Sequence, residues 1–416
     1  MGFAGNRVLI IVQNLPVPFD RRVWLEATTL SRHGYKVSVI CPKGKKGKDD
    51  AAYEFLENIH IHRYPTPPEA QGGLGYIFEF AYCWVLTAIL SLHVKISRGF
   101  DVIHACNPPE TYFALAWMYK LFGCKFIFDH HDLSPEMYAA KGGNVKGWLC
   151  RGLLFLEKLT FRTADVVITT NQSHKDIAKR RGNVPDERIF IVRSGPDLSR
   201  LKPVPPEPEL KNGRPYLVCY LGEMCPQDGV DYLLRSADYI IRNKGRKDIQ
   251  FTFIGGGPAM PQMQKLASEM DLDRWVHFTG RVSDADLCRY LSAADVCVDP
   301  DPYTEWSNQS TMNKIMEYMA FSKPIVAFDL RENHFSGQEA AVYAKPNDEQ
   351  EMAEMILDLI EDTERRERMG AYGRGRVETE LSWEHSVPHL LKAYEWVQKG
   401  KRTKEKYGGR TLKGAL

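Results

Sequence analysis

The sequence predicts an α/β fold with two Rossmann-like, doubly wound domains that face a central cleft. Its 416 residues are too many for one ordinary hydrophobic core. Short apolar runs alternate with helix-like segments along the first half, and the alternation starts again after a cluster of prolines. Strand, helix and strand in this order form βαβ units, whose parallel sheets bind ligands beyond the carboxyl ends of the strands.

The N-terminal domain is expected over residues 1–200. A helix-like segment over Arg21–His33, ended by Gly34, separates its first two strands. Apolar runs of strand length continue through the rest of this half. The strands expected in this domain are Val8–Val12, Lys36–Cys41, Ile59–Tyr64, Asp101–Ala105, Lys125–Asp129, Val166–Thr170 and Arg188–Val192.

A linker is expected at 201–215, where five prolines disfavour helix and strand. The C-terminal domain then covers 216–382. A last helix over Trp383–Lys399, which we expect to pack back toward the N-terminal domain, precedes a basic tail at 400–416. The strands expected in the C-terminal domain are Tyr216–Leu221, Gln250–Ile254, Val276–Thr279, Val296–Asp299 and Pro324–Phe328.

Charge and cysteine content narrow the class of protein. With 55 basic and 53 acidic residues the net charge is +2, which gives no support to a nucleic-acid partner. The 9 cysteines form no Cys-x-x-Cys pair, and the N-terminus lacks the pattern of a secretory signal. We therefore expect a cytoplasmic protein; the sequence indicates no particular oligomeric state.

The apolar, uncharged segment Phe80–Leu92 raises the question of a membrane. It is shorter than the roughly 20 residues that cross a bilayer, so we do not expect a transmembrane span. A buried helix and a helix lying at a membrane surface both remain open. The second would make the protein peripheral on the inner face of the cell membrane.

The most informative motif is Ser310-Thr-Met-Asn-Lys-Ile-Met-Glu-Tyr-Met-Ala320. Ser310 or Thr311 can cap the helix that starts here, and Lys314 and Glu317, three residues apart, then share one face. The first amides, from Thr311, Met312 and Asn313, and the Lys314 ammonium would bind a diphosphate, while Glu317 would accept bonds from ribose hydroxyls. The alternative is a surface ion pair on an amphipathic helix.

Glycine-rich loops follow two strands of the C-terminal domain. Gly222 follows one strand, and Gly255 and Gly256 follow the next. Glycine lets a phosphate or ribose approach the backbone and leaves amides free to donate. Neither loop matches a complete dinucleotide or P-loop pattern, so a tight strand-to-helix turn is the alternative.

In the N-terminal half, Asp129-His-His-Asp132 stands at the end of an expected strand, where side chains reach the cleft. His131 is our first candidate for a catalytic residue and His130 our second. Asp132 could orient a histidine or accept the proton of the acceptor. The alternatives are hydrogen-bonded turn residues or a metal site, which adjacent side chains rarely form; we expect no metal.

Two further residues are expected on the acceptor side. Asn107, in the loop Asn107-Pro-Pro-Glu110, could bond a substrate hydroxyl, although a turn-forming role is equally open. Glu136 closes the loop that follows the two histidines.

These motifs resemble those of retaining glycosyltransferases of family 4, which have the GT-B fold. The resemblance covers nearly the whole chain, from Asp20-Arg-Arg-Val23 through Glu317-Tyr-Met-Ala320 to Ser382-Trp-Glu384. It implies that Glu317 holds the donor ribose and that a histidine near His131 contacts the transferred sugar. It also implies a nucleoside-diphosphate sugar as donor, with UDP weakly preferred from family frequency, and often a lipid-linked acceptor in surface polysaccharide assembly.

The chain departs from the family pattern at two places. Gln309 stands where the family has the first of two glutamates; its amide can still bond hydroxyls of the donor sugar, but it cannot act as a charged nucleophile or base. Glu223 and Asp228 follow the first strand of the C-terminal domain, where many members carry an arginine and a lysine. We expect Lys314, the helix amides and Arg281 to supply the missing positive charge.

The expected reaction is transfer of a sugar to an acceptor hydroxyl with retention, by a front-face displacement in which the leaving phosphate accepts the proton. It requires no cofactor or metal, and Asp299-Pro-Asp301 is interpreted as a structural turn. The alternatives are a nucleotide-sugar epimerase or hydrolase of this architecture and a non-catalytic nucleotide-sugar-binding subunit. An NAD-dependent dehydrogenase is disfavoured because Gln13-Asn-Leu-Pro16 replaces a glycine fingerprint.

Overall fold

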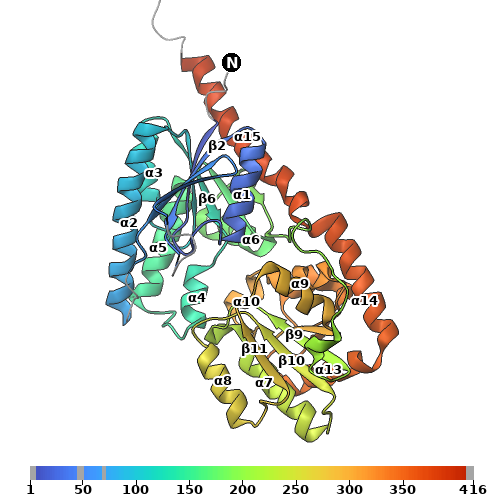
Figure 1. Ribbon diagram of the computed structural model, residues 1–416. Coiled ribbons are helices and arrows are strands. Elements are labelled where there is room, and N and C mark those ends of the chain that lie inside the picture. The colour runs from blue at the N-terminus through green and yellow to red at the C-terminus, as the bar shows by residue number, and fades with distance from the viewer. Residues whose placement is uncertain (1–5, 45–50, 68–71, 409–416) are drawn as a thin grey trace, which may run out of the picture. The chain divides into compact units, whose positions relative to one another are not determined.

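The computed structural model describes the backbone of residues 6–44, 51–67 and 72–408, and their side chains except at 72–74, 76–77 and 400–408. The chain divides into two compact units (Figure 1). The first contains residues 1–139, 143–193 and 386–416, and the second contains 140–142 and 194–385. Residues 201–215, where we expect a linker, lie within the second unit. Leu201 is buried in its core, and the Val204 amide donates to Ser292 Oγ (3.0 Å).

The first unit is built on a sheet that the described residues make eight-stranded, in the order β3-β4-β2-β1-β5-β6-β7-β8. All neighbours are parallel except β3 and β4. Most strands are continuous runs of buried apolar residues, as expected for a parallel sheet covered on both faces. The strands are β1 (Arg7–Ile11), β2 (Lys36–Pro42), β3 (Tyr53–Leu56), β4 (Ile59–Tyr64), β5 (Val102–Cys106), β6 (Lys125–His130), β7 (Val166–Thr169) and β8 (Ile189–Ile191).

Helices cover both faces of this sheet (Figure 1). The helices of the first unit are α1 (Arg21–Arg32), α2 (Gly72–Ser97), α3 (Phe113–Lys120), α4 (Ser134–Ala140), α5 (Trp148–Thr163), α6 (Gln172–Gly182) and α15 (Trp383–Gly408). The buried sides of α2, α3 and α5 share one apolar cluster with the sheet. On the other face lie α1 and α15, and the Tyr394 hydroxyl of α15 bonds with His104 Nδ1 of β5 (2.8 Å).

The second unit repeats the architecture, with six described strands in the order β11-β10-β9-β12-β13-β14, all parallel. One apolar cluster packs α7, α8 and α13 on one face, and another packs α9 and α11 on the other. Its strands are β9 (Tyr216–Leu221), β10 (Ile249–Ile254), β11 (Val276–Gly280), β12 (Val296–Asp299), β13 (Ile325–Phe328) and β14 (Ala341–Ala344). Its helices are α7 (Val230–Asp238), α8 (Met260–Glu269), α9 (Asp284–Ala293), α10 (Glu305–Gln309), α11 (Asn313–Ala320), α12 (Arg331–Gly337), α13 (Glu349–Glu361) and α14 (Thr363–Arg376).

Every strand expected from the sequence is present, with ends shifted by no more than one residue. The sequence analysis missed β3 and β14. Three of the four residues of β3 are exposed, so this edge strand carries no buried run that would reveal it. The strand β14, Ala-Val-Tyr-Ala, has little β-branched content.

Two helices are longer than expected. The prediction for Phe80–Leu92 is wrong in length, because α2 has 26 residues. Its segment Phe78–Ser97, with mean hydropathy 1.4, is long and apolar enough to cross a membrane, and 22% of the scored window is buried in the fold. The last helix continues to Gly408, through part of the segment where we expect a basic tail, and residues 409–416 lie outside the described residues.

Candidate active site

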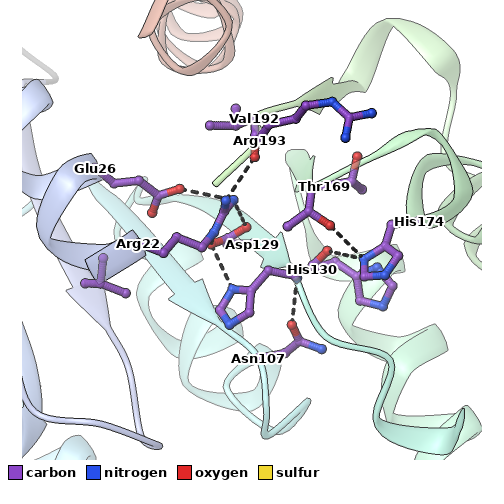
Figure 2. Close-up of polar contacts among 12 residues, drawn as sticks. Arg22, Glu26, Asn107, Asp129, His130, Thr169, His174, Val192 and Arg193 are labelled. Carbon is purple, nitrogen blue, oxygen red and sulfur yellow. Dashed lines mark hydrogen bonds and ion pairs between the residues drawn. The ribbon is translucent and has the colours of Figure 1, made fainter. Parts of the chain in front are cut away.

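A buried arginine organises the carboxyl edge of the first sheet. Asp20 caps α1 by accepting from the Val23 amide (3.0 Å), which places Arg22 in the first turn. The Arg22 guanidinium binds Asp129 at the end of β6 through two bonds, Nε–Oδ2 (2.8 Å) and Nη2–Oδ1 (2.7 Å), and lies 3.2 Å from Glu26 (Figure 2). It also donates to the carbonyl of Val192 (2.9 Å). Burial alone would raise the pKa of Asp129, but Arg22, His131 and His104 together hold that pKa well below its usual range.

His131 is attached to this ion pair. Its Nδ1 lies 3.0 Å from Asp129 Oδ2, and its backbone amide donates to Asn107 Oδ1 (2.9 Å). Burial disfavours a charged imidazole, yet the Asp129 carboxylate outweighs burial and raises the pKa of His131. The side chain stays 19% exposed. Asp129 thus fixes the ring and its tautomer, and the opposite nitrogen, Nε2, is the one that can meet a ligand.

His130, our second catalytic candidate, does not reach solvent. Its side chain is fully buried, with Nε2 3.3 Å from Glu157 Oε1, and its ring packs against Phe161 and His174. Successive residues of a strand point to opposite faces, so only one of two adjacent histidines can face the site. The structure therefore corrects the prediction for His130, which belongs to the core.

Asn107 is a turn residue, as the alternative interpretation held. It is 1% exposed, and its amide is used within the protein. Its Oδ1 accepts from the backbone amides of His131 and Asp132 (2.9 and 3.1 Å), and its Nδ2 donates to Glu110 (2.9 Å) and to the Asp132 carbonyl (2.7 Å). The prediction that it bonds a substrate hydroxyl is wrong for this conformation. Asn107 instead holds the loop that carries His131.

Asp132 and Glu136 also have partners within the fold. Asp132 Oδ1 accepts from the Leu133 amide (3.0 Å). Glu136, in the first turn of α4, forms an ion pair with Arg181, which also binds the buried Glu157 (3.2 Å). An acceptor-side role for Glu136 would compete with that pair.

Four buried side chains in this region have the spacing of metal ligands: Glu26, His104, Cys106 and Asp129. Arg22 already supplies a positive charge to the two carboxylates, at 3.2 and 2.7 Å. Burial raises the pKa of the Cys106 thiol, which keeps it protonated and a poor ligand. The cluster is therefore better described as an ion-paired core than as a metal centre. From the sequence, Arg22 was only part of the motif Asp20-Arg-Arg-Val23 and had no predicted role. Its position at the start of the helix that follows the first strand could have indicated that it lies at the carboxyl edge of the sheet.

In the second unit, Lys314 is held by two aspartates. Its Nζ lies 2.5 Å from Asp301 Oδ2, 3.1 Å from Asp299 Oδ1 and 5.1 Å from the centre of the Tyr220 ring, and its side chain is 12% exposed. Burial would lower the pKa of Lys314, but the two carboxylates raise it well above its usual value. Asp299-Pro-Asp301 therefore has a structural partner in Lys314, and much of the ammonium charge that we expected for a diphosphate is already compensated.

The predicted cap of the helix at Lys314 is wrong. Helix α11 starts at Asn313 with Met312 as its N-cap, and the Met312 side chain makes no capping bond to the first amides. Ser310 instead ends α10, where its hydroxyl donates to the Trp306 carbonyl (2.7 Å). A second short helix before the motif was not visible from the sequence. The start of α11, with Asn313 exposed, therefore keeps amides that can receive an anion.

Glu317 lies one turn further along α11. Its side chain is 24% exposed, and its carboxylate lies 3.7 Å from Arg200 Nη2, while Arg200 Nη1 binds Asp284 (2.9 Å). Gln309 donates to the carbonyl of Glu305 (2.9 Å). Arg200, which was not a candidate from the sequence, lies beside the Glu317 carboxylate and leaves part of that side chain accessible.

The glycine loops pack against each other. Gly255 has φ = +126°, and a Cβ built there would lie 1.9 Å from the Gly222 carbonyl oxygen, so only glycine fits. The Gly222 amide donates to Ile254 (3.0 Å) and the Gly255 amide to Gly280 (3.0 Å), so these two amides are not free for a phosphate as we expected. Arg281 lies against Gly256, where a Cβ would be 3.6 Å from its Cγ. The loops thus form one compact surface beside α11, because a Gly222 Cβ would lie 3.4 Å from Lys314 Cε.

The two acids that depart from the family pattern are compensated locally. Arg281 lies 3.8 Å from Glu223. Asp228 accepts from the Cys225 amide (2.8 Å), and burial raises the pKa of its carboxyl group. Both acids thus have partners within the second unit.

Comparisons with known proteins identify both units. Residues 20–195 match the model described as a glycosyl transferase 4-like domain, and residues 215–362 match glycosyl transferases group 1. The alpha-D-kanosaminyltransferase of Streptomyces kanamyceticus is 28% identical over 75% of this chain and 82% of its own length. Sucrose-phosphate synthase of Thermosynechococcus elongatus has the same fold, with a TM-score of 0.73 at 19% identity over 97% of this chain and 99% of that one.

The Anabaena protein HepE, solved in complex with UDP-glucose, also shares the fold, with a TM-score of 0.67 at 16% identity over 95% of this chain and 99% of that one. Together the two matched models span most of the chain, and the sheets and helices of both units agree with such relatives. The protein is therefore a glycosyltransferase of family 4 with the GT-B fold and uses a nucleotide-sugar donor.

Proposed function

We propose that the protein transfers a sugar from a nucleoside-diphosphate sugar, with UDP as the preferred nucleotide, to a hydroxyl of a lipid-linked glycan, with retention of configuration. The observation that carries the donor assignment is the partly exposed Glu317 side chain, one turn after the start of α11, where the N-cap Met312 makes no side-chain capping bond. Ribose hydroxyls can donate to this carboxylate while the diphosphate meets the first amides of α11. The fold's likeness to the UDP-glucose complex of HepE supports this placement.

The choice of a front-face displacement rests on Gln309. This amide donates to the Glu305 carbonyl and offers no carboxylate to attack the anomeric carbon. In a front-face route the glycosidic bond to the diphosphate breaks as the acceptor oxygen approaches from the same side, and a phosphate oxygen takes the acceptor proton. His131, kept in one orientation by the bond from its Nδ1 to Asp129, accepts a hydrogen bond from a hydroxyl of the transferred sugar at Nε2. No metal takes part in this proposal.

The test is a transfer assay with UDP-sugars and a membrane-lipid extract, with the anomeric configuration of the product read by NMR. We expect saturable transfer with retention. An inverted product would exclude the front-face route. Epimerised or hydrolysed sugar from the donor alone, at the rate seen with acceptor, would instead indicate an epimerase or hydrolase.

The lipid-linked acceptor rests on an exposed apolar face of the first unit. On α2 the apolar side chains recur every three to seven residues and are at least half exposed: Phe78, Val85, Ile89, Leu92 and Ile96. Two neighbouring helices add Trp117, Met118, Trp148 and Phe155. The exposed residues of α5 besides its aromatics are Arg151, Lys158 and Arg162, which are all basic. Aromatic and basic side chains together suit an anionic membrane surface.

Vesicle sedimentation tests this acceptor proposal. Ile89→Glu and Leu92→Glu each place a charge on the exposed stripe without removing a core contact, so we expect the protein to leave anionic vesicles. The matched control is Val145→Glu, an exposed apolar position outside the helices. Unchanged sedimentation of both α2 variants would remove the support for a membrane-borne acceptor.

A further inference from the structure

A polar cavity lies at the edge of the first sheet, between β3 and β4 and the last turns of α2. It has a volume of about 390 Å³ and is lined by Tyr53, His62, His93, Ser97 and Arg98. In the sheet, β2, β1 and β5 lie between β4 and β6, and β6 carries Asp129 and leads into His131. The cavity is therefore separated from the candidate active site by three strands.

The hydrogen bonds around the cavity leave a hydroxyl proton available. Arg98 donates to His60 Nε2 (2.8 Å) and to the Tyr53 hydroxyl oxygen (3.2 Å). Because His60 accepts at Nε2, its neutral tautomer carries the proton at Nδ1 and donates to the same hydroxyl (2.8 Å). The Tyr53 oxygen thus accepts two bonds, so its own proton can be donated elsewhere.

One wall of the cavity includes His62, whose Nε2 is buried. His62 is 6% exposed, and in the described part of the chain its Nε2 is buried with no hydrogen-bond partner. Burial, followed by His93, Arg98 and His60, lowers the pKa of His62 to about 4, so the ring is neutral at pH 7 and has one N–H to donate. A buried nitrogen without a partner costs free energy that a bound acceptor would recover.

The charge around the cavity has one sign. None of the five lining residues is acidic, and among the described residues no carboxylate forms an ion pair with Arg98. The His62 and His93 ring centres are 5.9 Å apart, and the nearby guanidinium repels a cation, which makes a metal ion a poor occupant. A guanidinium, a tyrosyl hydroxyl and imidazoles converge here as donors to an anion with several oxygens.

We propose that the cavity lined by Tyr53, His62, His93, Ser97 and Arg98 binds the phosphate group of a phosphate ester. Two sources share this chemistry: a lipid headgroup and a soluble phosphorylated molecule. The exposed Leu92 and Ile96 adjoin the lining residues along α2, so a headgroup could bind while its chains contact the apolar stripe. This site is separate from the donor site and does not rest on the proposed transfer reaction.

The test follows histidine ring signals by NMR and binding by calorimetry, with inorganic phosphate and glycerol 3-phosphate as probes. We expect saturable binding that shifts the His62 and His93 signals and raises the pKa of His62, because a bound anion would offset the positive charges of Arg98, His93 and His60 that disfavour the His62 imidazolium. Arg98→Gln should weaken binding about tenfold, the loss of one charge-assisted bond. The matched control, Arg32→Gln, changes an exposed arginine of α1 and should leave binding unchanged.

Vesicles of phosphatidylcholine, with and without phosphatidic acid, distinguish the two sources. Binding to phosphatidic acid that falls in Arg98→Gln assigns a lipid headgroup, whereas binding of the soluble probes without it assigns a soluble ester. Absence of saturable binding, or binding that Arg98→Gln leaves intact, overturns the proposal. His62→Gln is a second variant that keeps a polar side chain at the inner wall; it should abolish the His62 response and weaken binding even if Arg98→Gln unfolds.

Discussion

Each of the two units buries a cation between two carboxylates at the carboxyl end of its parallel sheet. In the first, Arg22 lies between Asp129 and Glu26; in the second, Lys314 lies between Asp299 and Asp301. The arginine forms a two-bond fork with Asp129 and has nitrogens left for a backbone carbonyl, whereas the lysine is a point charge.

The two clusters differ in whether they contact a partly exposed side chain. In the first, Asp129 also bonds His131, whose side chain is 19% exposed, so the ion pair orients a group that can contact a ligand. The Lys314 cluster is closed, and the accessible carboxylate beside it, Glu317, belongs to a separate pair with Arg200. The comparison indicates that the Arg22–Asp129 pair orients His131 in the first unit, whereas Lys314 holds the loop with Asp299 and Asp301 in place in the second.

The largest effect should come from breaking the arginine fork. Asp129→Asn leaves the Arg22 guanidinium buried with only Glu26 nearby, so we expect the unfolding free energy of the first unit to fall by about 3–5 kcal/mol. Urea unfolding followed by a probe in that unit measures it. The control Asp186→Asn removes an exposed pair with Lys175 and Lys179 and should change little. A loss of unfolding free energy below about 1 kcal/mol would mean that the Arg22–Asp129 pair contributes no more than an exposed surface ion pair.

The next effect concerns pH. Burial, followed by Asp129, raises the pKa of Glu26 from 4.5 to about 7. Between these values the folded state keeps a proton that the unfolded chain releases, so stability falls as pH rises through this window. Glu26→Gln removes this loss, and its stability relative to the unaltered protein should grow by about 2–3 kcal/mol from pH 4.5 to 7. A pH-independent difference in urea midpoints would show that Glu26 does not titrate here.

The donor carboxylate gives a smaller effect. Glu317→Gln should weaken UDP binding about 10- to 100-fold, because ribose hydroxyls lose a charged acceptor, with little change in stability. Calorimetry with UDP measures it, and Glu269→Gln, an exposed glutamate of α8, is the control. Equal affinities for all three proteins would remove Glu317 from the donor site.

Lys314→Ala sharpens the comparison most directly. We expect UDP binding to weaken about tenfold through loosening of the Asp299–Asp301 loop, together with a lower unfolding temperature of the second unit. The control is Lys265→Ala, whose side chain is 77% exposed. If Lys314→Ala lowers the unfolding temperature but leaves UDP binding unchanged, Lys314 has a structural role only. The prediction that it contributes to diphosphate binding would then be wrong.

Local patterns located most of the elements and candidate residues but not their partners. Strands such as Tyr216–Leu221 and Val296–Asp299 follow directly from buried apolar runs. The accessible Glu317 was identified from its spacing on a helix. By contrast, His130 and His131 look equivalent in sequence, and only the strand's alternation and the Glu157 contact make one of them a core residue.

The sequence by itself determined two doubly wound halves, the family, and the helix that carries Lys314 and Glu317, because hydrophobic periodicity and short motifs are local properties of a chain. The tertiary structure decided which charges meet: Arg22 with Asp129 across 107 positions, Lys314 with Asp299, and His62 with a cavity at the sheet edge. Such pairings depend on how strands are ordered in a sheet, and strand order brings together residues whose separation in sequence carries no signal of contact.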